Sequence, residues 1–228
     1  MNGQTAKSQR QGAAALQARS LFARLLALRE TALLIFIVFL VVVVSLRSPY
    51  FFTLKNFKDI LLDTAILMIV AMGQMMVIIT RGVDLSVGSG VAFTGMAVGL
   101  IISGHWGIHP LLAILMGAGI GLVLGSFNGL LVSRAGVPPI ITTLATMSIY
   151  RGMTYIISGG EWVDAHEMPD SFKLLARGSV LGVPNMILIV LLVAVVFYYF
   201  LEHTRKGRQI YAIGSNPNAG RFVGIDVE

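Results

Sequence analysis

The sequence predicts an all-α protein, a polytopic transmembrane helical bundle with about six spans. Of its 228 residues, 56% are hydrophobic and only 12% are charged, whereas a soluble domain usually carries about 25% charged residues. A soluble protein of this composition would expose large apolar patches, so lipid is the more plausible surrounding. The third observation is a series of apolar runs whose lengths come close to the roughly 20 residues that cross a bilayer.

Six apolar runs follow one another along the chain, and each is expected to form one membrane-spanning helix. They are Thr31–Leu46, Ile60–Thr80, Val87–Ser103, Leu111–Val132, Ile140–Ile157 and Met186–Leu201. The fourth run is the longest, and its polar interruptions are Ser126 and Asn128. The fifth is the weakest candidate because it carries Arg151. The sixth ends in aromatic residues, which suit a membrane interface.

The basic residues predict the orientation of these spans. The amino-terminal tail contains Lys7, Arg10, Arg19, Arg24 and Arg29 against one acid, Glu30. Positive flanks stay in the cytoplasm, so six crossings leave both ends of the chain inside and residues 158–184 outside. Arg47, Lys55 and Lys58 run against the rule, because this scheme leaves them outside. The expected divisions are a basic cytoplasmic tail (1–30), a membrane domain (31–201) and a cytoplasmic segment (202–228).

Glycines in the fourth run predict close helix packing. Gly117, Gly121, Gly125 and Gly129 recur every fourth residue and therefore share one helix face. A face without side chains lets two backbones approach closely, which favours association in lipid. The interface could be static, as in any polytopic protein, or could slide around a pathway. Gly88, Ala92, Gly95 and Gly99 give the third run a similar face.

The short segment between the second and third runs allows two interpretations. Asp84 could cap the next helix, with Ser86 as a second choice, because their oxygens can accept from free first-turn amides. The segment would then be a capped hairpin near the cytoplasmic face. Alternatively, residues 80–89 form a broken element that dips into the membrane and exposes backbone to a cavity.

Several polar groups lie within the apolar runs or beside them and are candidates for a translocation path. Asp84 and Ser86 belong to this group, together with Asn128, Thr142, Thr143, Thr146 and Arg151. A path for a polyhydroxylated solute needs weak polar contacts. The threonines could instead bond to their own helix backbone. A charged group in a span is normally kept for a role, although Arg151 could also reach the outer interface along its own stem.

No signature of an enzyme or a metal protein is present. The chain has no cysteine and no G-x-x-x-x-G-K-[ST] phosphate loop. Its four histidines are scattered and form no metal set. We therefore expect no catalytic residue, metal or cofactor, and any energy source would come from a partner. The net charge is +6, but the basic residues flank the apolar runs and form no separate basic domain. Lipid and not nucleic acid is therefore the expected partner.

The end of the chain predicts a short cytoplasmic helix from Pro217 to Val223. Asn216 is a good helix cap, Pro217 suits the first helical position, and Gly224 can close the helix. Such a surface helix can dock into a partner or simply connect two spans. The chain ends at Glu228, directly after this element, and we expect a fragment of a longer protein.

Four stretches of this chain resemble the inner-membrane permeases of the ribose, rhamnose, arabinose, xylose and autoinducer-2 class of ABC importers. They are Ser48–Thr53 with Asn56, Gly82–Ser89, Pro139–Gly152 and Gly207–Ile225. The resemblance implies that the last stretch is the loop that couples to the ATPase, with Asn216, Pro217, Ala219, Arg221 and Phe222 as coupling candidates. Family members usually have an acid and two alanines where this chain has Asn218-Ala219-Gly220. They also continue with further spans, so this chain resembles their amino-terminal part.

The resemblance further implies a function and a set of partners. A periplasmic binding protein would deliver a sugar-like solute, two identical or different permease subunits would form the path, and a cytoplasmic ATP-binding subunit would drive alternating access in the bacterial inner membrane. A secondary carrier, a channel or a non-transport scaffold would share this composition. A carrier normally needs ionisable residues within its spans, and the runs contain no acid near mid-span, which favours an external energy source.

Overall fold

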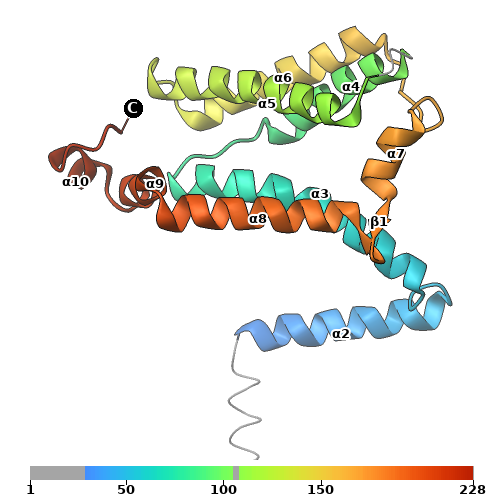
Figure 1. The fold of residues 1–228 in the computed structure, drawn as a ribbon. Helices are drawn as coiled ribbons and strands as arrows, with labels where there is room; N and C mark the ends of the chain where they lie inside the picture. The colour runs from blue at the N-terminus through green and yellow to red at the C-terminus, as the bar shows by residue number, and fades with distance from the viewer. Residues whose placement is uncertain (1–28, 105–107, 228) are drawn as a thin grey trace, which may run out of the picture. The chain divides into compact units, whose positions relative to one another are not determined.

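The computed structural model describes residues 29–104 and 108–227, and within them the chain is almost entirely helical (Figure 1). The helices are α2 (Arg29–Arg47), α3 (Leu54–Ile79), α4 (Val87–Ser103), α5 (Pro110–Ser133), α6 (Pro139–Ser158), α7 (Asp170–Arg177), α8 (Asn185–His203), α9 (Arg205–Ser215) and α10 (Pro217–Phe222). A two-stranded antiparallel hairpin consists of β1 (Ser179–Val180) and β2 (Val183–Pro184). The all-α fold class is confirmed. Residues 1–28, which form most of the predicted basic tail, lie outside the described residues.

Each of the six predicted apolar runs forms a helix, namely α2, α3, α4, α5, α6 and α8. The bounds of α4 are those predicted, while α5 and α6 are one residue longer at each end. The largest difference is in α3, which begins at Leu54 and so includes Lys55, Lys58 and Asp59 before the apolar run. An apolarity criterion misses this first part because helix geometry tolerates charged residues as readily as apolar ones.

Three of the described helices, α3, α5 and α8, are long and apolar enough to cross a membrane. The apolar part of α2 and the whole of α4 are shorter apolar helices. Helix α6, with 20 residues, is not in either group, in keeping with its polar residues. The protein is therefore a multi-pass membrane protein, while the count of six spans and the inside position of both ends stay predictions.

The apolar side chains of these helices are largely exposed on the surface of the chain. Leu122 on α5 is 71% exposed and Leu192 on α8 is 65% exposed. Leucines in water at such positions would form the large apolar patches that soluble proteins avoid. Lipid, or neighbouring helices in lipid, must therefore cover these faces.

The chain divides into two compact units, residues 1–59 and 60–228. In the first, a tight turn follows α2 and leads into α3. The Thr53 hydroxyl donates to the Tyr50 carbonyl at 2.7 Å and accepts from the Asn56 amide at 3.3 Å. The Asn56 side chain donates to the Phe51 carbonyl at 2.7 Å. These local bonds explain why Thr53 and Asn56 occupy this turn, since each satisfies backbone groups that the turn leaves free.

In the second unit, α4, α5 and α6 pack together as one bundle (Figure 1). Helix α4 contacts both of the others, and its contact with α6 is the more extensive. The buried residues Val98, Ile102 and Ala113 form a small apolar core between α4 and α5. Met168 and Phe172, from the segment after α6, pack against this core. Further along the chain, α8 leads directly into α9 and α10.

Residues 158–184, predicted only as an outside loop, contain the helix α7 and the β1–β2 hairpin. Pro169 precedes α7, and the salt bridge between Lys173 and Asp170 spans 3.1 Å within it. Asn185 Nδ2 donates to the Leu174 carbonyl at 3.1 Å and so ties the start of α8 to α7. Sequence patterns missed α7 because it is short and strongly amphipathic, so it contains no apolar run.

Candidate functional site

The segment Thr80–Ser86 between α3 and α4 is irregular, and side chains from two helices satisfy its backbone. Thr143, in the first turns of α6, places its hydroxyl 3.2 Å from the Val83 carbonyl. Gln74 on α3 donates from Nε2 to the Asp84 carbonyl at 3.1 Å. The segment thus runs alongside α3 and α6. These contacts tie the segment to both helices, while a broken element that dips into the membrane stays a prediction.

The predicted capping role of Asp84 is wrong. Ser86 occupies the N-cap position of α4 but makes no side-chain capping bond. Asp84 Oδ1 accepts from the Ser86 amide at 2.8 Å and from the Ser86 hydroxyl at 2.7 Å. It therefore binds the residue before the helix and no amide of the first turn of α4. The physical consequence is that Asp84 orients the Ser86 hydroxyl.

Ser86 is the centre of a buried polar network that joins α4, α5 and α6. Asn128 on α5 donates from Nδ2 to the Ser86 hydroxyl at 2.8 Å, and that hydroxyl donates to Asp84. The Tyr150 hydroxyl on α6 lies 3.0 Å from the Leu124 carbonyl and 3.4 Å from Asn128 Oδ1. Ser86 and Asn128 are 2% and 7% exposed. Because an unpaired buried polar group is costly, such a satisfied network holds its members in one arrangement.

This network lies at a groove of about 460 Å³ between α4 and α5, here called the α4–α5 groove. Its lining includes Asp84, Ser86, Thr94, Gly121, Gly125 and Asn128. Asp84 is half-buried, and the two salt bridges among the described residues lie elsewhere, at His166–Asp164 and Lys173–Asp170. The groove therefore combines a smooth glycine wall with one carboxylate and several neutral hydrogen-bonding groups. Those groups can exchange weak hydrogen bonds with hydroxyls of a solute.

The four predicted packing glycines of α5 divide into two classes. A Cβ atom on Gly117 would lie 3.6 Å from Thr94 Cγ2 and 3.8 Å from Val98 Cγ2, both on α4. At Gly121, Gly125 and Gly129, no atom of another described element lies within 4 Å of that position. Of these four glycines, Gly117 is therefore the one that packs closely on another described helix. The expected close contact is not found at the other three, and two of them line the α4–α5 groove.

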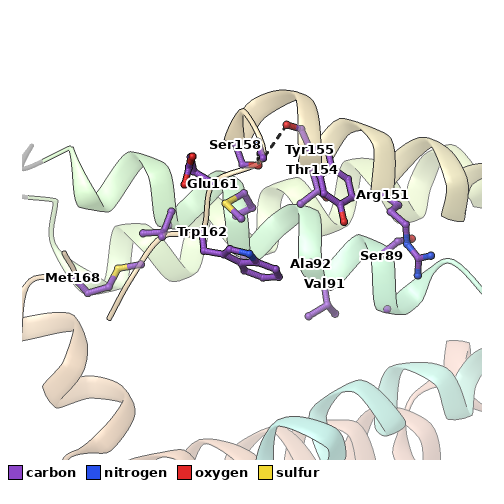
Figure 2. Close-up of a pocket in the computed structure, with 16 residues that line it drawn as sticks. Ser89, Val91, Ala92, Arg151, Thr154, Tyr155, Ser158, Glu161, Trp162 and Met168 are labelled. Atoms are coloured by element: carbon purple, nitrogen blue, oxygen red, sulfur yellow. Dashed lines mark hydrogen bonds between the residues drawn. The ribbon is translucent and has the colours of Figure 1, made fainter. Parts of the chain in front are cut away.

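A second groove of about 440 Å³, the α4–α6 groove, contains Arg151 (Figure 2). The small residues Gly88, Ala92, Gly95 and Gly99 of α4 all line it. In Figure 2, Arg151 lies at one end of the groove and Met168 at the other, with Trp162 between them. Arg151 is exposed, and no described acid pairs with it. Glu161 lines the same groove but forms no ion pair with Arg151, so the guanidinium can take water or polar solute atoms as its partners.

The three threonine candidates are buried and line neither groove. Thr143 also donates to the Pro139 carbonyl at 2.8 Å, and Thr146 donates to the Thr142 carbonyl at 3.1 Å. The Thr142 hydroxyl has no hydrogen-bond partner in the part of the chain that the structure describes. Bonding of threonine hydroxyls to their own helix, which the sequence left open, is therefore what Thr143 and Thr146 do.

The segment after α8 forms two helices, α9 and α10, of which only the second was predicted. Asn216 is the N-cap of α10, and its Oδ1 accepts from the Ala219 amide at 3.1 Å. Pro217 is the first helical residue, and the helix ends at Phe222, one residue before the predicted end. Arg221 is exposed and Phe222 is 91% exposed. The α10 helix thus presents an aromatic ring and a cation that nothing in the described chain covers.

Sequence reasoning missed Tyr150 and Arg81. Tyr150 is buried on α6, where a phenol needs a hydrogen-bond partner. The available signal was a tyrosine on the same helix face as Thr143 and Thr146, at a spacing of three and four residues. Arg81 lies between α3 and α4, and no local sequence pattern indicates that it contacts the Gly214 and Ser215 carbonyls. Among the described residues, no group of three or more His, Asp or Glu residues could hold a metal ion.

The amino-acid sequence matches known permeases over most of its length. Residues 56–228 match the protein family described as branched-chain amino acid transport system / permease component. The ribose import permease protein of Escherichia coli strain K12 is 38% identical over 202 residues, which cover 88% of this chain and 62% of that protein. No solved structure matches the chain.

Two further relatives carry different solute names. The D-allose transport system permease protein of Escherichia coli strain K12 is 35% identical over 185 residues, covering 81% of this chain and 56% of that protein. The autoinducer 2 import system permease protein of Klebsiella pneumoniae is 36% identical over 199 residues, covering 87% and 57%. The chain thus spans about three fifths of the length of these relatives.

Proposed function

The chain belongs to the family of branched-chain amino acid transport system permease components, and from this premise we propose that it forms part of the translocation pathway of an ATP-binding cassette importer. The solute is a monosaccharide or a sugar-like molecule of the ribose, rhamnose or autoinducer-2 type. The relatives named for ribose, allose and autoinducer 2 support this class of solute. All three are named as permease proteins of import or transport systems.

The α4–α5 groove is the observation that carries this proposal. It lies between apolar helices, yet Asp84, Ser86 and Asn128 bring hydrogen-bonding groups to it. A sugar hydroxyl can replace water at such groups, while the glycine wall leaves room for the ring. The contacts are few, so the solute is held weakly enough to move on. Arg151 in the α4–α6 groove is a second point of polar contact along the path.

The partners follow from what the chain lacks and what it exposes. No phosphate loop occurs in the sequence, so the ATP is hydrolysed by a separate ATP-binding subunit that docks on α10. A periplasmic binding protein delivers the solute, and a second permease subunit, identical or different, completes the path. The chain lies in the bacterial inner membrane with residues 158–184 outside and α9 and α10 in the cytoplasm.

A proton-coupled secondary carrier is the alternative that one observation favours. Asp84 is a half-buried acid without an ion-pair partner among the described residues, and it lines a groove between membrane helices. Acids in such positions often serve as proton relays. The two mechanisms differ in their energy source, because a carrier needs a proton gradient and an importer of the proposed class needs ATP.

The test is solute uptake by the complete permease, reconstituted into vesicles with its ATP-binding subunit and binding protein. Labelled ribose, allose and autoinducer 2 are offered in turn, with ATP inside the vesicles or with a proton gradient alone. We expect uptake of one of these solutes only with ATP. Uptake driven by the gradient without ATP would show a carrier and overturn the proposal.

The same assay tests the groove. Asn128→Ala should lower uptake at least about tenfold, because it removes the donor that holds the Ser86 hydroxyl at the groove. Ser126→Ala, two residues away on an exposed part of α5, is the matched control and should transport normally. Equal uptake by both variants would remove the α4–α5 groove from the path.

A further inference from the structure

Arg81 clamps the carboxyl end of α9. Its Nε donates to the Gly214 carbonyl at 2.6 Å and its Nη2 donates to the Ser215 carbonyl at 2.7 Å. The last carbonyls of a helix have no partner within the helix and carry partial negative charge. A guanidinium offers two donors in a fixed fork and a full positive charge, so it suits this pair of carbonyls better than an ammonium group does.

The backbone around this clamp is closely fitted. A Cβ atom on Gly214 would collide with the Ile79 carbonyl, at the carboxyl end of α3. Arg81 itself has a φ of 63°, a left-handed conformation that a non-glycine residue holds only where its surroundings enforce it. The end of α9 therefore lies directly against the end of α3, and the clamp fixes the segment between α3 and α4 in an unusual conformation.

The other end of α9 is held as well. The Thr204 hydroxyl donates to the Phe200 carbonyl of α8 at 2.6 Å and accepts from the Gly207 amide at 3.0 Å. Gly207 is buried, and a Cβ atom there would collide with the carbonyls of Phe200 and Leu201. Helix α9 is thus anchored on α8 at its start and on the end of α3 at its finish, and α10 follows immediately.

The clamped segment is the one that carries the polar network of the α4–α5 groove. Three residues after Arg81, the Asp84 carboxylate holds the Ser86 amide and hydroxyl, and Ser86 holds Asn128 of α5. Gln74 fixes the Asp84 carbonyl from α3. A displacement of the end of α9 must therefore displace residues 81–86, whose last residue, Ser86, is hydrogen-bonded to Asn128 in the groove.

We propose that Arg81 is a positioning residue that couples α9 and α10 to the Asp84–Ser86–Asn128 network, so that movement of the cytoplasmic helices changes the α4–α5 groove. This inference deepens the proposed function and rests on it. If Arg81 acted only as one of the cytoplasmic positive charges that orient membrane helices, lysine would serve equally well. The two-point clamp requires the arginine fork.

The experiment uses the complete importer and a reporter in the groove. Gly125→Cys lines the groove, has no neighbour within 4 Å of its Cβ position, and is the only cysteine in this chain. Its labelling rate with a thiol reagent is measured with and without ATP, together with solute-stimulated ATP hydrolysis. The background variants are Arg81→Ala, Arg81→Lys and, as matched control, Arg134→Ala. Arg134 is an exposed arginine at the end of α5 with no side-chain partner among the described residues.

The Arg81→Ala importer should still co-purify with the ATP-binding subunit. The change in labelling rate that ATP causes should be smaller than in the wild type by about tenfold or more, since one charge-assisted hydrogen bond corresponds to at least that factor. Arg81→Lys should be intermediate and Arg134→Ala normal. If Arg81→Ala does not fold, Arg81→Lys alone decides the question. A fully coupled Arg81→Lys or Arg81→Ala importer would overturn the clamp. A wild-type importer without any response to ATP would overturn the proposed function, and the clamp with it.

Discussion

The side-chain amide of Asn128 lies 2.8 Å from the hydroxyl of Ser86, 42 positions earlier in the chain. This bond joins α5 to the residue at the N-cap of α4, and the same hydroxyl donates to Asp84. Both residues are buried. Removing one partner should therefore leave the other without its bond in surroundings where water cannot replace it.

Ser86→Ala should lower the free energy of unfolding by about 1–3 kcal/mol, the usual cost of an unsatisfied buried polar group. Asn128→Ala should cost a similar amount, and the double variant should cost less than the sum because both remove the same bond. Thermal unfolding of the purified protein in detergent measures each difference. Strictly additive effects would show that the two side chains do not interact, and Ser148→Ala on the exposed face of α6 serves as control.

Gly117→Leu should reduce the yield of folded protein more than Gly121→Leu does. A side chain at Gly117 meets Thr94 and Val98 of α4, whereas Gly121 has open space around its Cβ position. Overpacking typically costs about 1–3 kcal/mol. Gly121→Leu should instead fold normally and lower uptake, because it fills the α4–α5 groove.

Gel filtration in detergent compares the two variants, with Leu122→Ala on the exposed side of α5 as control. Equal loss of folded protein in Gly117→Leu and Gly121→Leu would mean that another segment or a second subunit covers Gly121.

The positions of α2, α3, α4, α5, α6 and α8 could be predicted because each contains a long apolar run, whereas α7 and α9 contain none. The cap of α10 was also predictable, since Asn216 and Pro217 act within their own turn. Local patterns of this kind depend only on neighbours in the sequence.

The site could be predicted only in part. Asp84, Ser86 and Asn128 stood out as polar residues near spans, but their joining through Ser86 depends on how α4 packs on α5. The glycine spacing predicted that the four glycines share one helix face. It did not distinguish the close helix contact at Gly117 from the open groove at Gly121. Arg81 was the least predictable, because its partners at Gly214 and Ser215 are more than 130 positions away.

Cysteines placed singly at Ser171 and Ser215 should react differently with a membrane-impermeant thiol reagent. Ser171 lies in α7 and Ser215 at the end of α9, and both are exposed. The chain has no native cysteine, so there is no background. In intact cells only Ser171→Cys should be labelled, because residues 158–184 are predicted outside. Labelling of Ser215→Cys from outside would contradict the six-span topology.

Phe222→Asp should weaken docking of the ATP-binding subunit while leaving membrane insertion intact. Phe222 is 91% exposed on α10, outside every predicted span, and no other part of the described chain covers it. If its ring fills a cleft in the partner, an aspartate there would be a buried charge without a counterion, at a cost of about 3–5 kcal/mol. Asn218→Asp adds the same charge to the same helix without removing the ring, and should keep most of the binding. Co-purification of the ATP-binding subunit and solute-stimulated ATP hydrolysis measure the effect in the complete importer. If Phe222→Asp left both at the wild-type level, α10 would not be the docking element, and the importer assignment would rest on the family match and the α4–α5 groove.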